Sequence, residues 1–183
     1  PKLPGFGNSS ISLSSYWYDQ NKTFESYVGE LFSDWTENFS TEFKVSKRDY
    51  SSIAAPYANL PGIIIQNFGN RQTLNLGTER NRHANVINTE QLNLFGAGTY
   101  YAGDHAIKFG FDHEDNDVLN YYGRDINGVY TFSSLADFEA GKVNRYDLRA
   151  PRAGGSYGDI PASYNFKNTG LFVQDTWSVN YNL

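Results

Sequence analysis

The chain has 183 residues, a formal net charge of −5, no cysteine and no methionine. The missing cysteines exclude a disulfide framework and a thiolate metal site, and the acidic balance argues against nucleic acid as the main partner. Aromatic residues make up 16% of the sequence, yet no run of about 18 apolar residues predicts a transmembrane helix. A membrane protein built of alternating strands is still compatible with this composition, because such strands give no peak of hydropathy.

Six runs of alternating residues predict long strands. The segment from Phe39 places Phe, Thr and Val on one face and charged residues and serine on the other, and the segment after Ala106 repeats the pattern. A soluble sheet with one wet face alternates in the same way, so length is the stronger signal. Each run reaches or exceeds the roughly 9–11 residues that cross a bilayer at a tilt. The predicted strands are residues 10–20, 22–35, 39–50, 87–102, 105–118 and 164–177.

The connections between these strands differ in length. Tight turns are predicted at 34–39, 102–105 and 178–182, and long connections at 51–86 and 119–163. If the tight turns share one side of the sheet, the long connections share the other. Short periplasmic turns and long external loops are typical of outer-membrane barrels, whereas compact soluble domains rarely carry two structureless loops of this length.

Aromatic residues gather at the ends with tight turns: Trp35, Phe39, Tyr100, Tyr101 and Trp177. Rings with an apolar body and a polar group suit the boundary between membrane and water, so we interpret them as a girdle. The alternative is that they close hairpins in a soluble sheet.

The long connections carry structure of their own. Residues 62–68 and 73–76 flank a turn and predict an external hairpin. Residues 134–141 predict a short helix that Ser134 caps, with Asp137 three residues later.

Several stretches together resemble part of a TonB-dependent outer-membrane receptor of the Oar-like group. They are residues 34–45 (DWTENFSTEFKV), 106–112 (AIKFGFD) with 132–141 (FSSLADFEAG), and 168–180 (NTGLFVQDTWSVN). The last stretch is the most telling, because its strand and turn pattern recurs widely in such barrels. These motifs describe barrel geometry, so they identify the architecture better than the substrate.

The resemblance implies an all-β fold in which this chain is an antiparallel transmembrane β-barrel segment with long extracellular loops. The complete barrel would have twenty-two strands and would be plugged by an N-terminal domain. Six strands are fewer than the roughly eight of the smallest barrel. We therefore expect residues 1–183 to form a partial barrel domain without its plug. We also expect Ile11–Gln20 and Leu171–Trp177 to pair with strands outside this sequence.

The same resemblance implies a location and partners. The location is the Gram-negative bacterial outer membrane, and import would be driven by the TonB system from the proton gradient of the inner membrane. The expected partners are the remainder of the barrel and its plug, the TonB system, outer-membrane lipid and lipopolysaccharide, and a transported ligand of unknown identity.

Two groups of residues are candidates for function. The first comprises charged residues that alternation places toward the lumen, where they face a plug or pair across strands. These are Glu42, Lys44, Arg48, Lys108, Asp112 and Glu114. The second comprises Tyr and Arg residues of the external loop, which suit first contact with a ligand or pack loop against loop. These are Tyr121, Tyr122, Arg124, Tyr130, Arg145, Arg149 and Arg152.

No pattern predicts an enzyme, a metal site or a cofactor. The acidic run at 112–117 offers oxygen ligands for Ca²⁺, but it lacks the spacing of an EF-hand, and a strand that rises into water explains it better. His83 and His105 have no evident catalytic or metal-binding partner. The leading hypothesis is therefore energised transport, and the alternatives are a secreted β-rich adhesin or carbohydrate-binding module and a passive porin.

Overall fold

The computed structural model describes residues 1–5 and 7–180. Strands hold 63% of the residues and helices 6%, which confirms the predicted all-β class. The chain divides into two compact units, each described by itself below. The loop unit comprises Pro1–Thr23, Ser51–Asn88 and Leu119–Ala162. The wall unit comprises Phe24–Tyr50, Thr89–Val118 and the segment from Ser163 onward.

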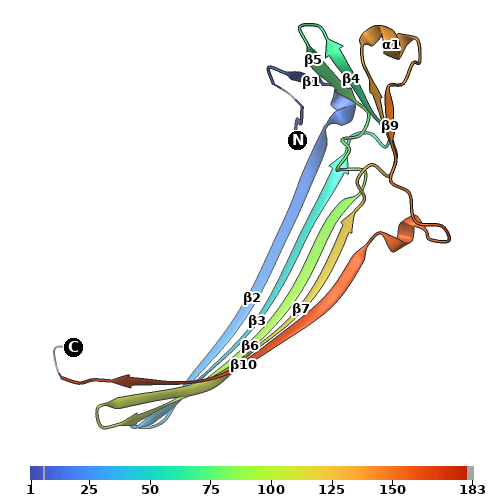
Figure 1. Ribbon diagram of the computed structural model, residues 1–183. Coiled ribbons are helices and arrows are strands. Elements are labelled where there is room, and N and C mark those ends of the chain that lie inside the picture. The colour runs from blue at the N-terminus through green and yellow to red at the C-terminus, as the bar shows by residue number, and fades with distance from the viewer. Residues whose placement is uncertain (6, 181–183) are drawn as a thin grey trace. The chain divides into compact units, whose positions relative to one another are not determined.

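Five long strands form one sheet in the order β10-β7-β6-β3-β2 (Figure 1). They are β2 (Tyr18–Thr36), β3 (Phe39–Pro56), β6 (Asn85–Ala102), β7 (His105–Tyr122) and β10 (Ala162–Trp177). Side-chain pairs show the antiparallel direction of β2 and β3, because Trp35 meets Thr41 whereas Glu30 meets Lys44. The sheet is not closed within the described residues, since β2 and β10 are both edge strands.

Four of the predicted strands coincide with β3, β6, β7 and β10, which extend further by up to six residues at one end. The predicted strand at 22–35 is confirmed within β2, whereas the predicted strand at 10–20 is wrong. Residues 18–36 form the single strand β2, and the residues before it form the short strand β1 (Ser10–Ser12) and the 3-10 helix η1 (Ser14–Tyr16).

The physical reason is a set of contacts that the local pattern cannot reveal. Leu13 N donates a hydrogen bond to Asn75 O at 2.9 Å, and Gly77 N donates to Ser15 Oγ at 3.0 Å. Strand β1 pairs in parallel with β5 (Gln72–Leu76). The expectation that Ile11 pairs with a strand outside the sequence is therefore wrong, because Ile11 pairs with Leu74.

Strand β10 ends at Trp177, immediately before the third predicted tight turn. Ser178 N donates to the carbonyl oxygen of Asp104 at 2.8 Å, which brings the end of β10 beside the turn between β6 and β7. The remainder of the predicted turn, residues 181 and 182, lies outside the described residues.

The loop unit contains a second sheet of mixed direction, in the order β1-β5-β4-β8-β9. Its further strands are β4 (Gly62–Phe68), β8 (Val129–Phe132) and β9 (Arg145–Asp147). The predicted hairpin is confirmed as β4 and β5, so the long connections are ordered and not structureless. No helix among the described residues is long and apolar enough to cross a membrane.

The predicted helix is confirmed as α1 (Leu135–Glu139), where Ser134 Oγ accepts from Asp137 N at 3.1 Å. A second 3-10 helix, η2, covers Tyr157–Asp159. The most deeply buried apolar side chains of the described chain include Ile65 and Val129, both in the second sheet. The hydrophobic core therefore lies in the loop unit, whereas the wall unit is a single layer.

Glycines let aromatic rings lie flat on the wall unit. Gly96 faces the rings of Phe111 and Phe43, and Gly98 faces the ring of Phe109. An added Cβ at Gly96 would lie 2.7 Å from Phe111 Cε1. Rings that cover glycines in this way shield the backbone and fix the register of neighbouring strands.

Gly110→Ala should destabilise the wall unit, because the added Cβ would collide with the carbonyl oxygen of Gly96 on the neighbouring strand. The expected loss is about 1–3 kcal/mol of unfolding free energy, the usual cost of overpacking. Urea titration of the full-length protein in lipid vesicles would measure it. Gly170→Ala is the matched control, since an added Cβ there meets nothing within 4 Å. Equal stability of the two variants would contradict the proposed close approach.

Candidate functional site

One face of the wall unit is apolar and open to its surroundings. Phe43, Val45 and Phe109 are 48%, 46% and 45% exposed. Leu92 and Leu94 on β6 continue the same face, because alternate residues of a strand point the same way. An apolar surface of this extent requires an apolar environment or a partner.

Polar and aromatic pairs bound this apolar face at its two ends. At one end the His105 ring stacks on Trp177 at 5.5 Å, and its Nδ1 lies 2.8 Å from Asp175. Asp175 is a polar partner of His105 that was not evident from the sequence. At the other end His113 Nδ1 lies 2.7 Å from the Thr169 hydroxyl.

The apolar run on β7 lies between His105 and His113. Eight residues of strand cover about 26 Å, or about 20 Å of height at a tilt of roughly 40°. This height is slightly less than the apolar band of about 25 Å found in membrane barrels. The predicted girdle fits this boundary in part. Tyr100 shares the apolar face, but its neighbour Tyr101 points to the opposite one.

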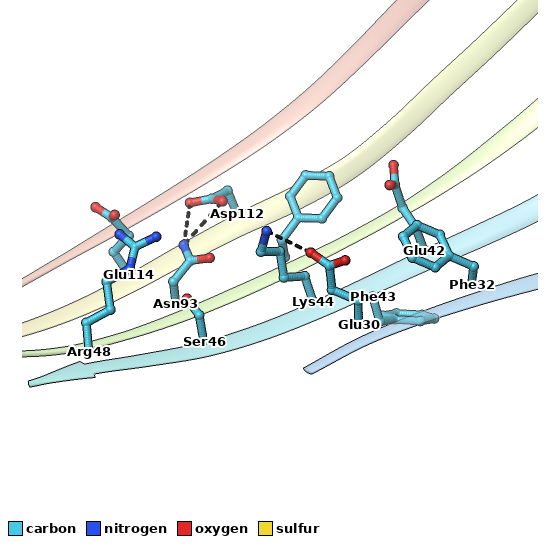
Figure 2. Close-up of a pocket in the computed structure, with 11 residues that line it drawn as sticks. Glu30, Phe32, Glu42, Phe43, Lys44, Ser46, Arg48, Asn93, Asp112 and Glu114 are labelled. Atoms are coloured by element: carbon cyan, nitrogen blue, oxygen red, sulfur yellow. Dashed lines mark hydrogen bonds and ion pairs between the residues drawn. The ribbon is translucent and has the colours of Figure 1, made fainter. Parts of the chain in front are cut away.

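The opposite face of the wall unit carries the predicted lumen residues. Lys44 Nζ lies 2.8 Å from Glu30 Oε1, and Lys108 pairs with Glu42. Five of the six predicted residues line a hollow of about 450 Å³ (Figure 2). They are Glu42, Lys44, Arg48, Asp112 and Glu114. The structure thus brings the predicted lumen set together on one face.

Amide side chains link the remaining charges of this face. Arg48 donates to Gln91 at 3.2 Å, and Gln91 donates to Glu114 at 3.0 Å. Asn93 donates to Asp112 at 3.2 Å, as Figure 2 shows. The sequence analysis missed Gln91 and Asn93, although extending the alternation along 87–102 would have placed them on this face.

A buried ion pair organises the loop unit. The Asp125 side chain is 3% exposed and accepts hydrogen bonds from Arg80 Nε at 3.0 Å and Arg80 Nη2 at 2.8 Å. The bond to Asp125 raises the pKa of the Arg80 guanidinium. The sequence analysis missed this pair, because the two residues lie 45 positions apart.

The segment next to Arg80 is also tightly bonded. Thr78 is 0% exposed, and its hydroxyl donates to Ala58 O at 2.6 Å. Burial, with a smaller contribution from Glu79, raises the pKa of Tyr16 to about 12. The Nδ1 atom of His83 accepts a hydrogen bond from Asn127 N at 3.0 Å, which requires a neutral ring.

The seven predicted ligand-binding residues do not form one site. Tyr122, Arg124 and Arg149 line a cavity of about 160 Å³. The other four do not line it: Tyr121, Tyr130, Arg145 and Arg152. Tyr130 stacks on Tyr146 at 4.5 Å, and Arg145 pairs with Asp147 at 2.6 Å. Packing of loop on loop, the alternative weighed for these residues, therefore describes Tyr130 and Arg145.

Residues 18–183 match the family described as outer membrane beta barrel domain, and the chain belongs to this family. The two-faced wall unit has the architecture that this family requires, with an apolar face toward lipid. The location is therefore the Gram-negative bacterial outer membrane. No curated protein and no solved structure matches the chain.

Membership of this family disfavours the secreted adhesin. An adhesin of that kind would bury Phe43, Val45, Ile107 and Phe109 between two sheets. Phe43, Val45 and Phe109 are instead about half exposed on a single layer, and Ile107 is partly exposed. The coarse prediction of an outer-membrane β-barrel protein is confirmed.

Asp125→Asn should loosen the loop unit, because it removes the carboxylate that accepts both short hydrogen bonds from Arg80. Breaking one partner of a buried pair costs roughly 3 kcal/mol, so protease cleavage within the loop unit should become about 100-fold faster. Native-state proteolysis of the full-length protein in nanodiscs would measure this rate. Lys142→Gln is the control, since its ion pair with Asp137 spans 3.7 Å and the lysine is 79% exposed. Cleavage of Asp125→Asn at the wild-type rate would contradict a structural role for the pair.

The loop unit should also lose stability in mild acid through His83. Burial lowers the pKa of His83 below its ordinary value of 6.5, so the unfolded chain binds the proton more readily than the folded one. Stability from the neutral ring is complete above about pH 6.5 and falls as the pH drops toward the lower folded pKa. Proteolysis at pH 7.5, 6.5 and 5.5 should show this loss, and His83→Gln should reduce its slope. An unchanged slope in His83→Gln would assign the acid sensitivity to other groups.

Proposed function

We propose that the chain forms part of the barrel wall of a TonB-dependent receptor of the Oar-like group. Such a receptor binds a bulky ligand at its external loops and imports it with energy transmitted by TonB. The observation that carries the proposal is the polar face of the wall unit, where charges are paired or bonded to amides across neighbouring strands. An ordered polar lumen of this kind suits contact with a folded plug.

The charge balance of this face indicates which sign of charge the plug surface should carry. Lys44 and Lys108 are neutralised by Glu30 and Glu42. Asp112 and Glu114, in contrast, receive hydrogen bonds from uncharged amide groups. An amide adds no charge, so among the described residues these two carboxylates face a single unpaired cation in the hollow, Arg48, and the remaining negative charge favours basic residues on the plug.

The remainder of the barrel belongs to the same proposal. Strands β2 and β10 are the edges of the described sheet. An edge in lipid leaves backbone groups without hydrogen bonds, so neighbouring strands must pair with both edges. Twenty-two strands, a plug and the TonB system complete the proposed receptor, and the mechanism includes no catalytic step and no cofactor.

Lipopolysaccharide is the proposed partner of the charged residues that follow the apolar run on the lipid-facing side of the wall unit. Lys167 Nζ lies 2.7 Å from Asp115, and Lys47 Nζ lies 3.4 Å from Asp49. These charges share the parity of the apolar side chains on β7 and β3, so they continue the same face. They lie where a strand leaves the apolar layer and enters the head-group region.

Conductance of the full-length protein in planar bilayers would test the plug. We expect near-zero conductance in the wild type and a several-fold increase in the double variant Asp112→Lys/Glu114→Lys, because lysines would repel the basic plug surface. Asp117→Lys is the control, since it makes one such change of acid to lysine on the opposite face of β7. A large open conductance in the wild type would favour the passive porin.

Binding of the purified periplasmic domain of TonB to the full-length protein would test the energy source. Calorimetry should detect binding, because the proposed transport requires direct contact with TonB. A closed barrel without detectable TonB binding would overturn energised import and leave the outer-membrane wall as established.

A further inference from the structure

We propose that the cavity beside Arg124 and Arg149 binds the anionic end of a ligand, as a carboxylate attached to a small apolar group. This inference deepens the proposed function and rests on it, since it names the chemistry that the external loops would recognise. The cavity measures about 160 Å³ and lies within the loop unit. Its apolar lining includes Ile126, Pro151 and Ile160.

The two arginines that line the cavity belong to an ion-pair cluster with more positive than negative charge. Four guanidinium groups lie near two carboxylates, namely Arg80, Arg124, Arg145 and Arg149 near Asp125 and Asp147. Arg80 holds Asp125 with two hydrogen bonds at 3.0 and 2.8 Å. Arg145 holds Asp147 through two donors on a single oxygen, Oδ1, at 2.8 and 2.6 Å. Both carboxylates therefore already have a strongly bonded cation.

The two arginines that line the cavity, Arg124 and Arg149, are the ones that make no short side-chain hydrogen bond to either carboxylate. Arg124 Nε lies 3.4 Å from Asp125 Oδ2, and Arg149 Nε lies 3.9 Å from the same atom. The first distance exceeds the usual range of an N–H···O bond, and the second is much too long. No acidic residue lines the cavity. An anion there would meet two guanidinium groups whose nearest carboxylate, that of Asp125, lies 3.4 and 3.9 Å away and is already hydrogen-bonded to Arg80.

The Nε donor of Arg124 also makes no hydrogen bond within the part of the chain that the structure describes, although it lies 3.4 Å from Asp125 Oδ2. This donor is buried. A buried donor without an acceptor is unfavourable, so a ligand oxygen that accepts from it gains binding energy. Guanidinium groups bind carboxylates through paired, parallel hydrogen bonds, which selects for a planar oxyanion.

The size and lining of the cavity define the rest of the ligand. Pockets for drug-sized molecules measure roughly 300–1,000 Å³, so a cavity of about 160 Å³ holds one small group and not a whole bulky ligand. Its apolar residues favour an aliphatic or aromatic group next to the carboxylate. Tyr122, which is 44% exposed, stands at the same cavity and adds a ring surface. The site therefore fits the acidic terminus of a larger ligand, such as the C-terminal residue of a peptide.

Ligand-observed NMR on the full-length protein in nanodiscs would test the site with three probes. Benzoate should bind saturably, and its neutral counterpart benzamide should bind at least 10-fold more weakly. Inorganic phosphate should also bind more weakly, because it lacks the apolar group. Equal binding of benzamide would overturn the role of charge, and equal binding of phosphate would overturn the role of the apolar lining.

Variants of the two arginines would test whether they bind the benzoate probe. Arg124→Gln and Arg149→Gln should each weaken benzoate binding about 10-fold, whereas Arg71→Gln, in the turn between β4 and β5, should not change it. Protease protection of the loop unit would verify folding. The Arg149 side chain is 65% exposed, so Arg149→Gln should fold normally. This variant therefore tests the site even if Arg124→Gln does not fold. Unchanged benzoate binding in Arg149→Gln would overturn the proposal.

The outcome is separable from the test of transport. Benzoate binding is measured on purified protein without TonB. Loss of TonB binding with an intact benzoate site would overturn the proposed transport alone. A protein that binds TonB but not benzoate would overturn the anion site alone.

Discussion

Backbone hydrogen bonding in lipid is the constraint on which the wall of this protein depends. Hydrocarbon offers no partner for an N–H or C=O group, so each strand that crosses it must be bonded on both sides. Five long strands satisfy one another in the order β10-β7-β6-β3-β2. Side chains are then free to alternate between a lipid face and a lumen face, and each face acquires its own chemistry.

The two units solve different problems of stability. The wall unit is one layer deep, so close strand contact depends on rings that lie over glycines, as Phe111 does over Gly96. The loop unit packs a small mixed sheet and adds a buried ion pair between Arg80 and Asp125. Paired charges there hold segments that are distant in sequence, which is how long connections become ordered.

The alternation of apolar and polar residues predicted the strands of the wall unit. The face on which a side chain lies and the length of a strand both depend on local sequence, so both could be predicted. Glu42, Lys44 and Asp112 were assigned to one face from alternation alone, and they line one hollow. Their partners were not predictable in the same way, since Gln91 and Asn93 contribute through the register between strands.

The same alternation failed at residues 10–20. A serine-rich alternating run looks like a membrane strand, but its contacts with Asn75 and Gly77 turn it into β1 and η1. Asp125 was missed for a related reason. It adopts a φ of +57°, and its partner Arg80 lies in another connection, so neither conformation nor pairing leaves a local signal.

The short apolar run between His105 and His113 has a consequence for the surrounding bilayer. An apolar run of about 20 Å in height along β7 is shorter than an average hydrocarbon layer, which is about 30 Å thick. Lipids next to β7 must then compress, and the energetic cost of this hydrophobic mismatch grows with the thickness of the host membrane. Bacterial outer membranes are thinner than average. The short apolar run therefore fits the outer membrane better than a thicker bilayer, and this preference does not depend on any ligand.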